Sequence, residues 1–338
     1  MSAQDIQTAN IAMETKPGHQ GHGPIGIFVA DYGVLLLMAA TYIVFCGLRP
    51  GSFLTFFVMK SILRDCVPLM VAALGITFVF VMNDYDLSIG GLTALMATTA
   101  VLFVSDSYVG LGTVLGVALT IMIGGLIAFT SGLLIAYGGL PSFILTIALG
   151  TVFTGIGLQL TNSRSLYEGL PDSYAAIASG TVFGMSNQIF IGVSVLAVCH
   201  LLLRHTEPGR YMYAIGGNPE AARLSGVPVK LLKATGFGLV GIAASISAVL
   251  LTSQANAANP NTGLGILLPA YAAAFLGSSV FRSGLFTALG TGLAALYLQV
   301  IGTGLTILSL SGPLVQMIQG AILIGAIALA VLNRKRMK

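Results

Sequence analysis

Charged residues are scarce in this sequence: of its 338 residues, only 8% are Asp, Glu, Lys or Arg, while 56% are hydrophobic. A soluble domain of this length needs far more charge to cover its surface, so the composition excludes that class. Trp is absent and 43 residues are Gly, which is typical of tightly packed membrane helices, where small residues let backbones approach closely. The scarcity of charge therefore indicates an integral membrane protein.

Cysteine and histidine are also few, and neither forms a metal-site pattern. Cys46, Cys66 and Cys199 lie in or beside apolar runs without a C-x-x-C spacing, which favours a structural role. His19 and His22 sit in a Gly-rich stretch; a metal contact there would need further ligands, so a disordered tail is favoured. Residues 1–24 are predicted to form a disordered cytoplasmic tail that stays attached, because no signal-peptide pattern opens the chain.

The sequence lacks the motifs of an energy source of its own. No G-x-x-x-x-G-K-[ST] run occurs, so the chain is not expected to bind ATP phosphates in the Walker manner. Ion coupling usually places ionisable residues within membrane spans. Here the spans are nearly free of them, with Asp31 and His200 near span ends. Coupling through a partner is favoured. The alternatives are an ion-coupled secondary transporter using Asp31 or Asp86, and an intramembrane enzyme, for which H-E-x-x-H and G-x-S-x-G are missing.

Long apolar runs predict an all-α, polytopic membrane protein with about ten transmembrane helices, because a span needs roughly 20 apolar residues. The runs cover residues 32–48, 66–82, 87–104, 109–137, 142–160, 188–203, 234–253, 266–281, 284–301 and 313–332. Residues 53–64 mix aromatic and charged side chains, which predicts a helix lying in the membrane interface. Residues 25–338 therefore form a single predicted membrane domain.

The distribution of Lys and Arg predicts the orientation, because cytoplasmic regions carry the excess. With the amino terminus inside, eleven fall on the cytoplasmic side: Lys16, Arg204, Arg210, Arg223, Lys230, Lys233, Arg282, Arg334, Lys335, Arg336 and Lys338. The outer side holds four: Arg49, Lys60, Arg64 and Arg164. Both termini are thus expected in the cytoplasm. The outer connection 161–187 is either a short helix for a soluble partner or a solvated cap.

The most polar internal stretch is the predicted cytoplasmic loop 204–233. Asn218 suits a helix N-cap, Pro219 suits the first helical position, and Glu220 complements the positive helix end. Ala221, Ala222 and Leu224 continue the helix, and Gly226 with Pro228 ends it. The result is a short helix with small side chains, which fits either a cleft in a partner protein or a simple connector between two spans.

This loop resembles the coupling loop of permeases from bacterial ABC importers for ribose, galactose, related monosaccharides and the furanosyl autoinducer. The segment 213–227 carries the family's EAA-x-x-x-G spacing, residues 86–90 read D-L-S-I-G, and residues 141–146 read P-S-F-I-L-T. Residues 273–277 are similar to a further A-A-x-x-L-G run. The sequence departs from many relatives at Asn83, Asp84 and Tyr85, where two glycines and an aliphatic residue are common, and near 267–269 and 278–282.

The resemblance implies a permease subunit without enzymatic chemistry of its own. Two permease subunits would face each other, two cytoplasmic ATPases would hold ATP and Mg, and a periplasmic binding protein would deliver a sugar or sugar-like solute. This chain would need no cofactor or metal. The residues that would couple it to the ATPase are Asn218, Glu220, Ala221, Ala222 and Gly226.

Polar residues within the spans are candidates for the translocation path, because hydroxyls and amides suit a polyhydroxylated solute. They are Asn83, Asp86, Ser88, Thr146, Thr151, Gln159, Gln299, Gln316 and Gln319. The competing interpretation, favoured for any single Thr or Gln, is a hydrogen bond between helices. For Asp86 a capping role at the start of the third span is favoured over solute binding.

Overall fold

The structure is a computed structural model that describes residues 36, 38–281, 285–315, 317–318, 320–321 and 324–325. Helix Met38–Leu48 is followed by α3 (Pro50–Phe53), α4 (Phe56–Val81), α5 (Ile89–Val104), α6 (Gly112–Gly138), α7 (Ser142–Thr161), α8 (Asp172–Ser179), α9 (Asn187–His205), α10 (Glu207–Gly217), α11 (Pro219–Leu224), α12 (Val229–Ala255), α13 (Leu267–Gly277) and α14 (Ala288–Ile307). The predicted tail 1–24, with His19 and His22, lies outside the described residues, as do Asp31, Gln316 and Gln319.

The described chain is mostly helical with almost no sheet, which confirms the all-α membrane class. Six helices within it are long and apolar enough to cross a membrane: α4, α6, α7, α9, α12 and α14. Helices Met38–Leu48, Ile89–Val104 and Leu264–Gly277 are apolar but shorter, so the predicted count of about ten is not established. A small hairpin, β1 (Thr181–Val182) with β2 (Met185–Ser186), pairs antiparallel, with Thr181 opposite Ser186.

The predicted interfacial helix at 53–64 is wrong, because α4 runs without interruption from Phe56 to Val81. Its 26 residues give a rod of roughly 39 Å, longer than the roughly 30 Å hydrocarbon core, so its first turns can extend beyond the core. The charges there find partners. Lys60 Nζ donates to the Gly184 carbonyl at 2.6 Å, and Arg64 pairs with Asp65 at 2.7 Å.

A proline inside α4 explains one buried polar residue. Pro68 lacks the N–H that would bond to the Arg64 carbonyl one turn earlier. The amide of Gln188, which is fully buried in α9, donates to that carbonyl at 3.0 Å. The Ser247 hydroxyl of α12 donates to the Pro68 carbonyl at 2.9 Å. Gln188 thus satisfies the carbonyl that Pro68 leaves without its helical partner, and both side chains tie α9 and α12 to α4.

Helices α4, α5 and α12 are mostly buried, whereas few residues of α6, α7 and α9 are buried. Helix α12 lies against both α4 and α6. A methyl group at Gly241 would overlap the Gly124 carbonyl of α6, so glycine is required for this close approach. Packing of small residues, and not long apolar side chains alone, therefore holds the centre together.

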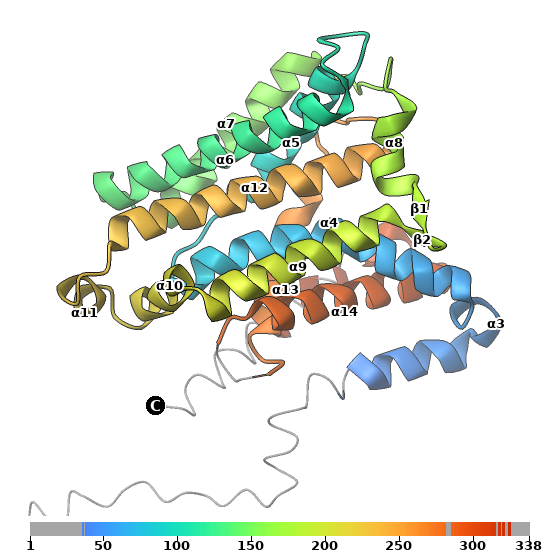
Figure 1. Cartoon of the computed structure of the whole chain (residues 1–338). Helices are drawn as coiled ribbons and strands as arrows, with labels where there is room; N and C mark the ends of the chain where they lie inside the picture. The colour runs from blue at the N-terminus through green and yellow to red at the C-terminus, as the bar shows by residue number, and fades with distance from the viewer. Residues whose placement is uncertain are drawn as a thin grey trace, which may run out of the picture.

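The connections gather at two ends of the bundle. One end, which we call the coupling-loop end, holds α10, α11, the α4–α5 connection and the α6–α7 turn, where Lys230 lies over the Tyr137 ring at 5.2 Å. The opposite end holds α8 and the hairpin (Figure 1). There Leu166 and Ala258 exchange two backbone hydrogen bonds of 2.8 Å. The chain 161–187 does form a short helix, α8, whose buried Tyr174 bonds to Thr252 at 2.5 Å.

Candidate functional site

Between α4 and α5 the backbone leaves the helical conformation for residues 82–88, which we call the junction. Asp86 is buried there, and its Oδ1 accepts from the Ser88 amide at 2.8 Å and the Ser88 hydroxyl at 2.5 Å. These bonds close a turn just before α5, whose N-cap is Ser88, so Asp86 shapes the approach to the helix and does not itself cap it. Non-helical backbone at membrane depth is tolerated only where protein surrounds it or water reaches it. The junction is thus an irregular segment among the core helices.

Helix α7 contributes a third polar residue to the junction. Thr146 is fully buried; its hydroxyl accepts from the Leu87 amide at 3.1 Å and donates to the Ser142 carbonyl at 2.8 Å. A methyl group at Gly150, one turn later, would press against the Ser88 backbone at 3.2 Å. The structure therefore brings Asp86, Ser88 and Thr146 together, and all three serve the local backbone.

The other predicted path residues do not join this group. Asn83 is exposed, with a left-handed φ of 61° that Asn adopts more easily than most residues. Thr151 and Gln159 lie on the exposed face of α7, and the Thr151 hydroxyl donates to the Ile147 carbonyl at 3.2 Å. Gln299, on α14, donates to the Thr303 hydroxyl at 3.3 Å. The candidates thus divide between the junction, the outer face of α7 and α14.

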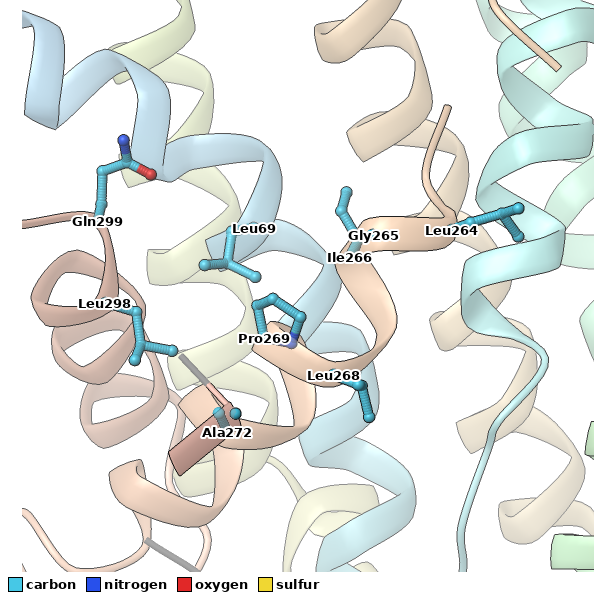
Figure 2. A pocket seen from close by; sticks show the side chains of 10 residues that line it. Leu69, Leu264, Gly265, Ile266, Leu268, Pro269, Ala272, Leu298 and Gln299 are labelled. Carbon is cyan, nitrogen blue, oxygen red and sulfur yellow. The ribbon is translucent and has the colours of Figure 1, made fainter. Parts of the chain in front are cut away.

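Gln299 lines a cavity of about 490 Å³ between α4, α13 and α14 (Figure 2). Its walls are mostly apolar, from Leu69, Pro269 and Leu298, and the cavity lies within the roughly 300–1,000 Å³ of small-molecule sites. Figure 2 shows the Gln299 amide at one side of it and Leu264 at the other. Among the described path candidates, Gln299 is the one that reaches this cavity.

At the coupling-loop end, α11 has the caps that its sequence predicts. Asn218 Oδ1 accepts from the amides of Glu220 and Ala221, both at 3.0 Å. Gly226 follows the helix with a φ of 86°, a conformation that side chains with a Cβ rarely adopt. Arg223 forms a 2.5 Å ion pair with Glu220, and this hydrogen bond lowers the pKa of the Glu220 carboxyl. The carboxylate therefore stays ionised at neutral pH.

The two alanines of α11 face opposite ways. Ala222 is buried against the permease, so it anchors the helix and is not available to another protein. Ala221 is exposed, as is Leu224, whose side chain is 77% exposed. Helix α10 was not predicted from the sequence. Its N-cap is Thr206, whose hydroxyl accepts a hydrogen bond from the Gly209 amide at 3.2 Å. The outward face of α11 thus combines a small residue, a large apolar residue and an ion pair.

Three contacts hold this end of the chain in place: one reaches the junction, one the end of α4, and one the segment that enters α14. Lys233 Nζ, at the start of α12, pairs with Asp84 Oδ2 at 2.8 Å, and both side chains are largely buried. A methyl group at Gly216 of α10 would overlap the Val81 carbonyl at the end of α4. The Tyr213 hydroxyl of α10 donates to the Phe286 carbonyl at 2.6 Å. The loop around α11 is therefore packed directly on the end of α4.

Aromatic side chains extend this connection. The Phe80 ring, at the end of α4, lies 5.0 Å from both Phe286 and Tyr271 and 5.6 Å from Tyr85 (ring centroids). These aromatic pairs form a cluster beside the junction, with α13 contributing Tyr271. The pairing of Asp84 with Lys233, and the contacts of Tyr213 and Gly216, were not predicted from the sequence. The sequence feature that could have indicated the pair is that Asp84 and Lys233 are opposite charges that each border an apolar run.

The remaining candidate ligands in the described chain are the histidines, cysteines and carboxylates. Within those residues no group of three or more His, Cys, Asp and Glu side chains is placed to hold a metal ion. Cys66 and Cys199 are buried and Cys46 is half-buried, all as free thiols. Their surroundings fit the structural role that the sequence favours.

Comparison with known proteins places these features in a family. Residues 58–327 match the family described as branched-chain amino acid transport system, permease component. The chain is 30% identical over 288 residues to the ribose import permease protein RbsC of Escherichia coli (strain K12), covering 84% of this chain and 88% of that protein. It is 27% identical over 319 residues to the D-allose transport system permease protein AlsC of the same organism, covering 94% and 95%.

A third relative can be aligned over nearly its whole length with this chain. The ribose import permease protein RbsC of Bacillus subtilis (strain 168) is 29% identical over 339 residues, covering 99% of each chain. No solved structure matches the chain. The family match spans α4 to α14, including the junction and the α10–α11 region. The chain therefore belongs to this permease family, as a multi-pass membrane subunit of an ABC transporter that has no catalytic activity of its own.

Proposed function

We propose that this chain imports a monosaccharide or sugar-like solute, as the names of its ribose and D-allose relatives state for those proteins. A periplasmic binding protein delivers the solute, and two cytoplasmic ATPase subunits supply ATP and Mg. The permease pairs with a second permease subunit, identical or not. Membership of an ABC permease family supports this function over the ion-coupled alternative.

The observation that carries the proposal is the seating of α11. Its outward face, with Ala221 and Leu224, stands clear of the permease, while the preceding helix α10 is packed on the end of α4 at Gly216. An ATPase that grips α11 can therefore displace α10 and the start of α12 together. The Lys233–Asp84 pair passes that displacement to the junction. Conversion between inward-open and outward-open states follows when ATP favours one arrangement.

The orientation we propose puts the coupling-loop end in the cytoplasm. Arg204, Arg210, Arg223, Lys230 and Lys233 all lie in that region, consistent with the positive-inside rule. The opposite end, with α8 and the hairpin, then faces the binding protein. Residues 25–338 form the permease domain with its cytoplasmic coupling loop 204–233, and residues 1–24 form a cytoplasmic tail.

The path itself needs only weak binding, because a tightly held solute would not leave. The cavity beside Gln299 offers one amide on an otherwise apolar wall, which suits transient contact with hydroxyl groups. Asp86, Ser88 and Thr146 act in this scheme by holding the junction in shape. Their hydrogen bonds go to each other and to nearby backbone, which supports this role.

Uptake into proteoliposomes tests the proposal. The permease is reconstituted with its ATPase and binding protein, and uptake of radiolabelled ribose, allose and galactose is measured. Uptake should require internal ATP and should survive collapse of the proton and sodium gradients. Uptake by the permease alone, driven by an ion gradient, would establish the secondary-transporter alternative instead.

A further inference from the structure

A second cavity, of about 770 Å³, lies at the coupling-loop end where α9 meets α10. His200 and Arg204 of α9 line it, together with Arg210 of α10. Leu285 and Leu289 line it from the chain that enters α14. We propose that this pocket, which we call the basic pocket, binds the phosphate headgroup of an anionic phospholipid.

The cations of the basic pocket are unpaired in the described part of the chain. The ion pairs found there involve Arg64, Arg223 and Lys233, and none involves Arg204 or Arg210. Glu207 lies three residues from each arginine, yet neither pairs with it. Among the described residues that line the pocket, none is acidic. Two guanidinium groups without a carboxylate partner are a strong site for a phosphate, which they can bind in a bidentate manner.

The opposite wall of the basic pocket is apolar and exposed. Phe281, Leu285 and Leu289 are 47%, 44% and 39% exposed, although they are large hydrophobic residues. Helix α9 also exposes apolar side chains, among them Leu201 at 54%. A free phosphate would leave this wall in contact with water. A phospholipid covers it with acyl chains while its headgroup meets the arginines, so the combination of charge and apolar surface favours the lipid.

The position fits a lipid at the membrane surface. Helix α9 ends at His205, and α10 begins at Glu207 outside the span, so the arginines flank the point where the chain leaves the bilayer. In the proposed orientation this is the cytoplasmic leaflet, whose anionic lipids attract basic residues. Only the choice of leaflet rests on the proposed function; the lipid chemistry does not.

Native mass spectrometry of the detergent-solubilised permease tests the proposal without any transport measurement. Phosphatidylglycerol and phosphatidylcholine with identical acyl chains are titrated separately. We expect tighter binding of phosphatidylglycerol. Arg204→Gln and Arg210→Gln should each weaken it about fivefold, and the double variant about 25-fold. Arg164→Gln, at the opposite end of the bundle, is the matched control and should leave binding unchanged.

Further arms separate the lipid from other occupants. Inorganic phosphate at millimolar concentration should not displace phosphatidylglycerol, and Leu289→Ser should weaken lipid binding while both arginines remain. Equal binding of the two lipids, full displacement by phosphate, or unchanged binding in the double variant would overturn the proposal. So would a double variant that binds lipid normally but loses the ATPase subunits, because the pocket would then be a protein-docking face.

Discussion

Asp84 and Lys233 show how one ion pair can join two distant parts of the chain. They are separated by almost 150 positions, yet their charged atoms lie 2.8 Å apart and their side chains are only 11% and 23% exposed. Removing one partner from such a site leaves the other charge poorly solvated, which costs more than the intact pair contributes. The pair is thus sensitive to single substitutions.

We expect Asp84→Asn to destabilise the permease by about 1–2 kcal/mol, because Lys233 then keeps its charge in a largely buried site without a carboxylate. Solute-stimulated ATP hydrolysis should fall more than basal hydrolysis, since the junction is uncoupled from α12. Thermal unfolding and ATPase assays on the assembled transporter measure both. Asp84→Lys combined with Lys233→Asp should recover part of each loss; if stability recovers without stimulation, the pair is structural only.

Gly216 and Gly217 form a matched pair of neighbours. A methyl group at Gly216 would overlap the Val81 carbonyl, whereas one at Gly217 would meet nothing within 4 Å. Gly216→Ala should therefore push α10 away from α4 and lower solute-stimulated ATP hydrolysis several-fold. Gly217→Ala should be neutral or slightly stabilising, because alanine favours a helix. Equal behaviour of the two variants would show that the α10–α4 contact does not transmit motion.

At the scale of elements, α11 is a six-residue helix that its own sequence stabilises at both ends. Asn218 satisfies two amides at the start, and Gly226 accommodates the left-handed turn after it. Helices this short do not persist in isolation, so packing of Ala222 against the permease must also hold α11 in place. The packing of Ala222 therefore also fixes the orientation of the exposed face of α11, which carries Ala221 and Leu224.

Ala221→Arg should insert and fold normally but lose ATPase docking, because a long charged side chain cannot enter a packed interface. Copurification of the ATPase subunits and solute-stimulated ATP hydrolysis measure the effect, which should be at least tenfold. Ala221→Ser keeps the side chain small and should retain docking. Ala222→Arg is less informative, since it should disturb the permease itself. Normal solute-stimulated ATP hydrolysis with Ala221→Arg would show that α11 only connects two spans.

At the scale of the whole molecule, the two ends of the bundle differ in their number of Lys and Arg residues, and the proposed orientation rests on that difference. The region 204–233 holds five Lys and Arg residues, and the opposite side holds Arg49, Lys60, Arg64 and Arg164. With the remaining basic residues of the chain, the positive-inside rule predicts the orientation without reference to any partner. Helix packing fixes the residues of each end in place: α8 packs on α12 at one end, and α10 packs on α4 at the other.

Cysteine labelling in intact cells tests this orientation. Ser225→Cys and Ser173→Cys are both at exposed positions, at the coupling-loop end and the opposite end respectively. A membrane-impermeant maleimide should label Ser173→Cys and should label Ser225→Cys only after the cells are opened. The opposite pattern would overturn the orientation and, with it, the proposed docking of the ATPase on α11.

The sequence by itself determined the class of the molecule and its local structures. Scarce charge and long apolar runs predicted helical membrane spans, since neither needs information from distant residues. The caps of α11 were predictable for the same reason: Asn218 and Gly226 act on backbone within a few positions. The described chain contains six helices long enough to span a membrane, whereas the predicted count of about ten is not established.

Only the tertiary structure decided which side chains meet. On a helix that is hydrophobic all round, the sequence does not indicate which face a polar residue occupies. Thr146 is buried, whereas Thr151 and Gln159 on the same helix are exposed. Likewise Ala221 and Ala222 differ only in the face that packing covers. The Asp84–Lys233 pair and the Gly216 contact arise from the approach of α10 and α12 to α4, because packing of the whole bundle sets that approach and no local pattern encodes it.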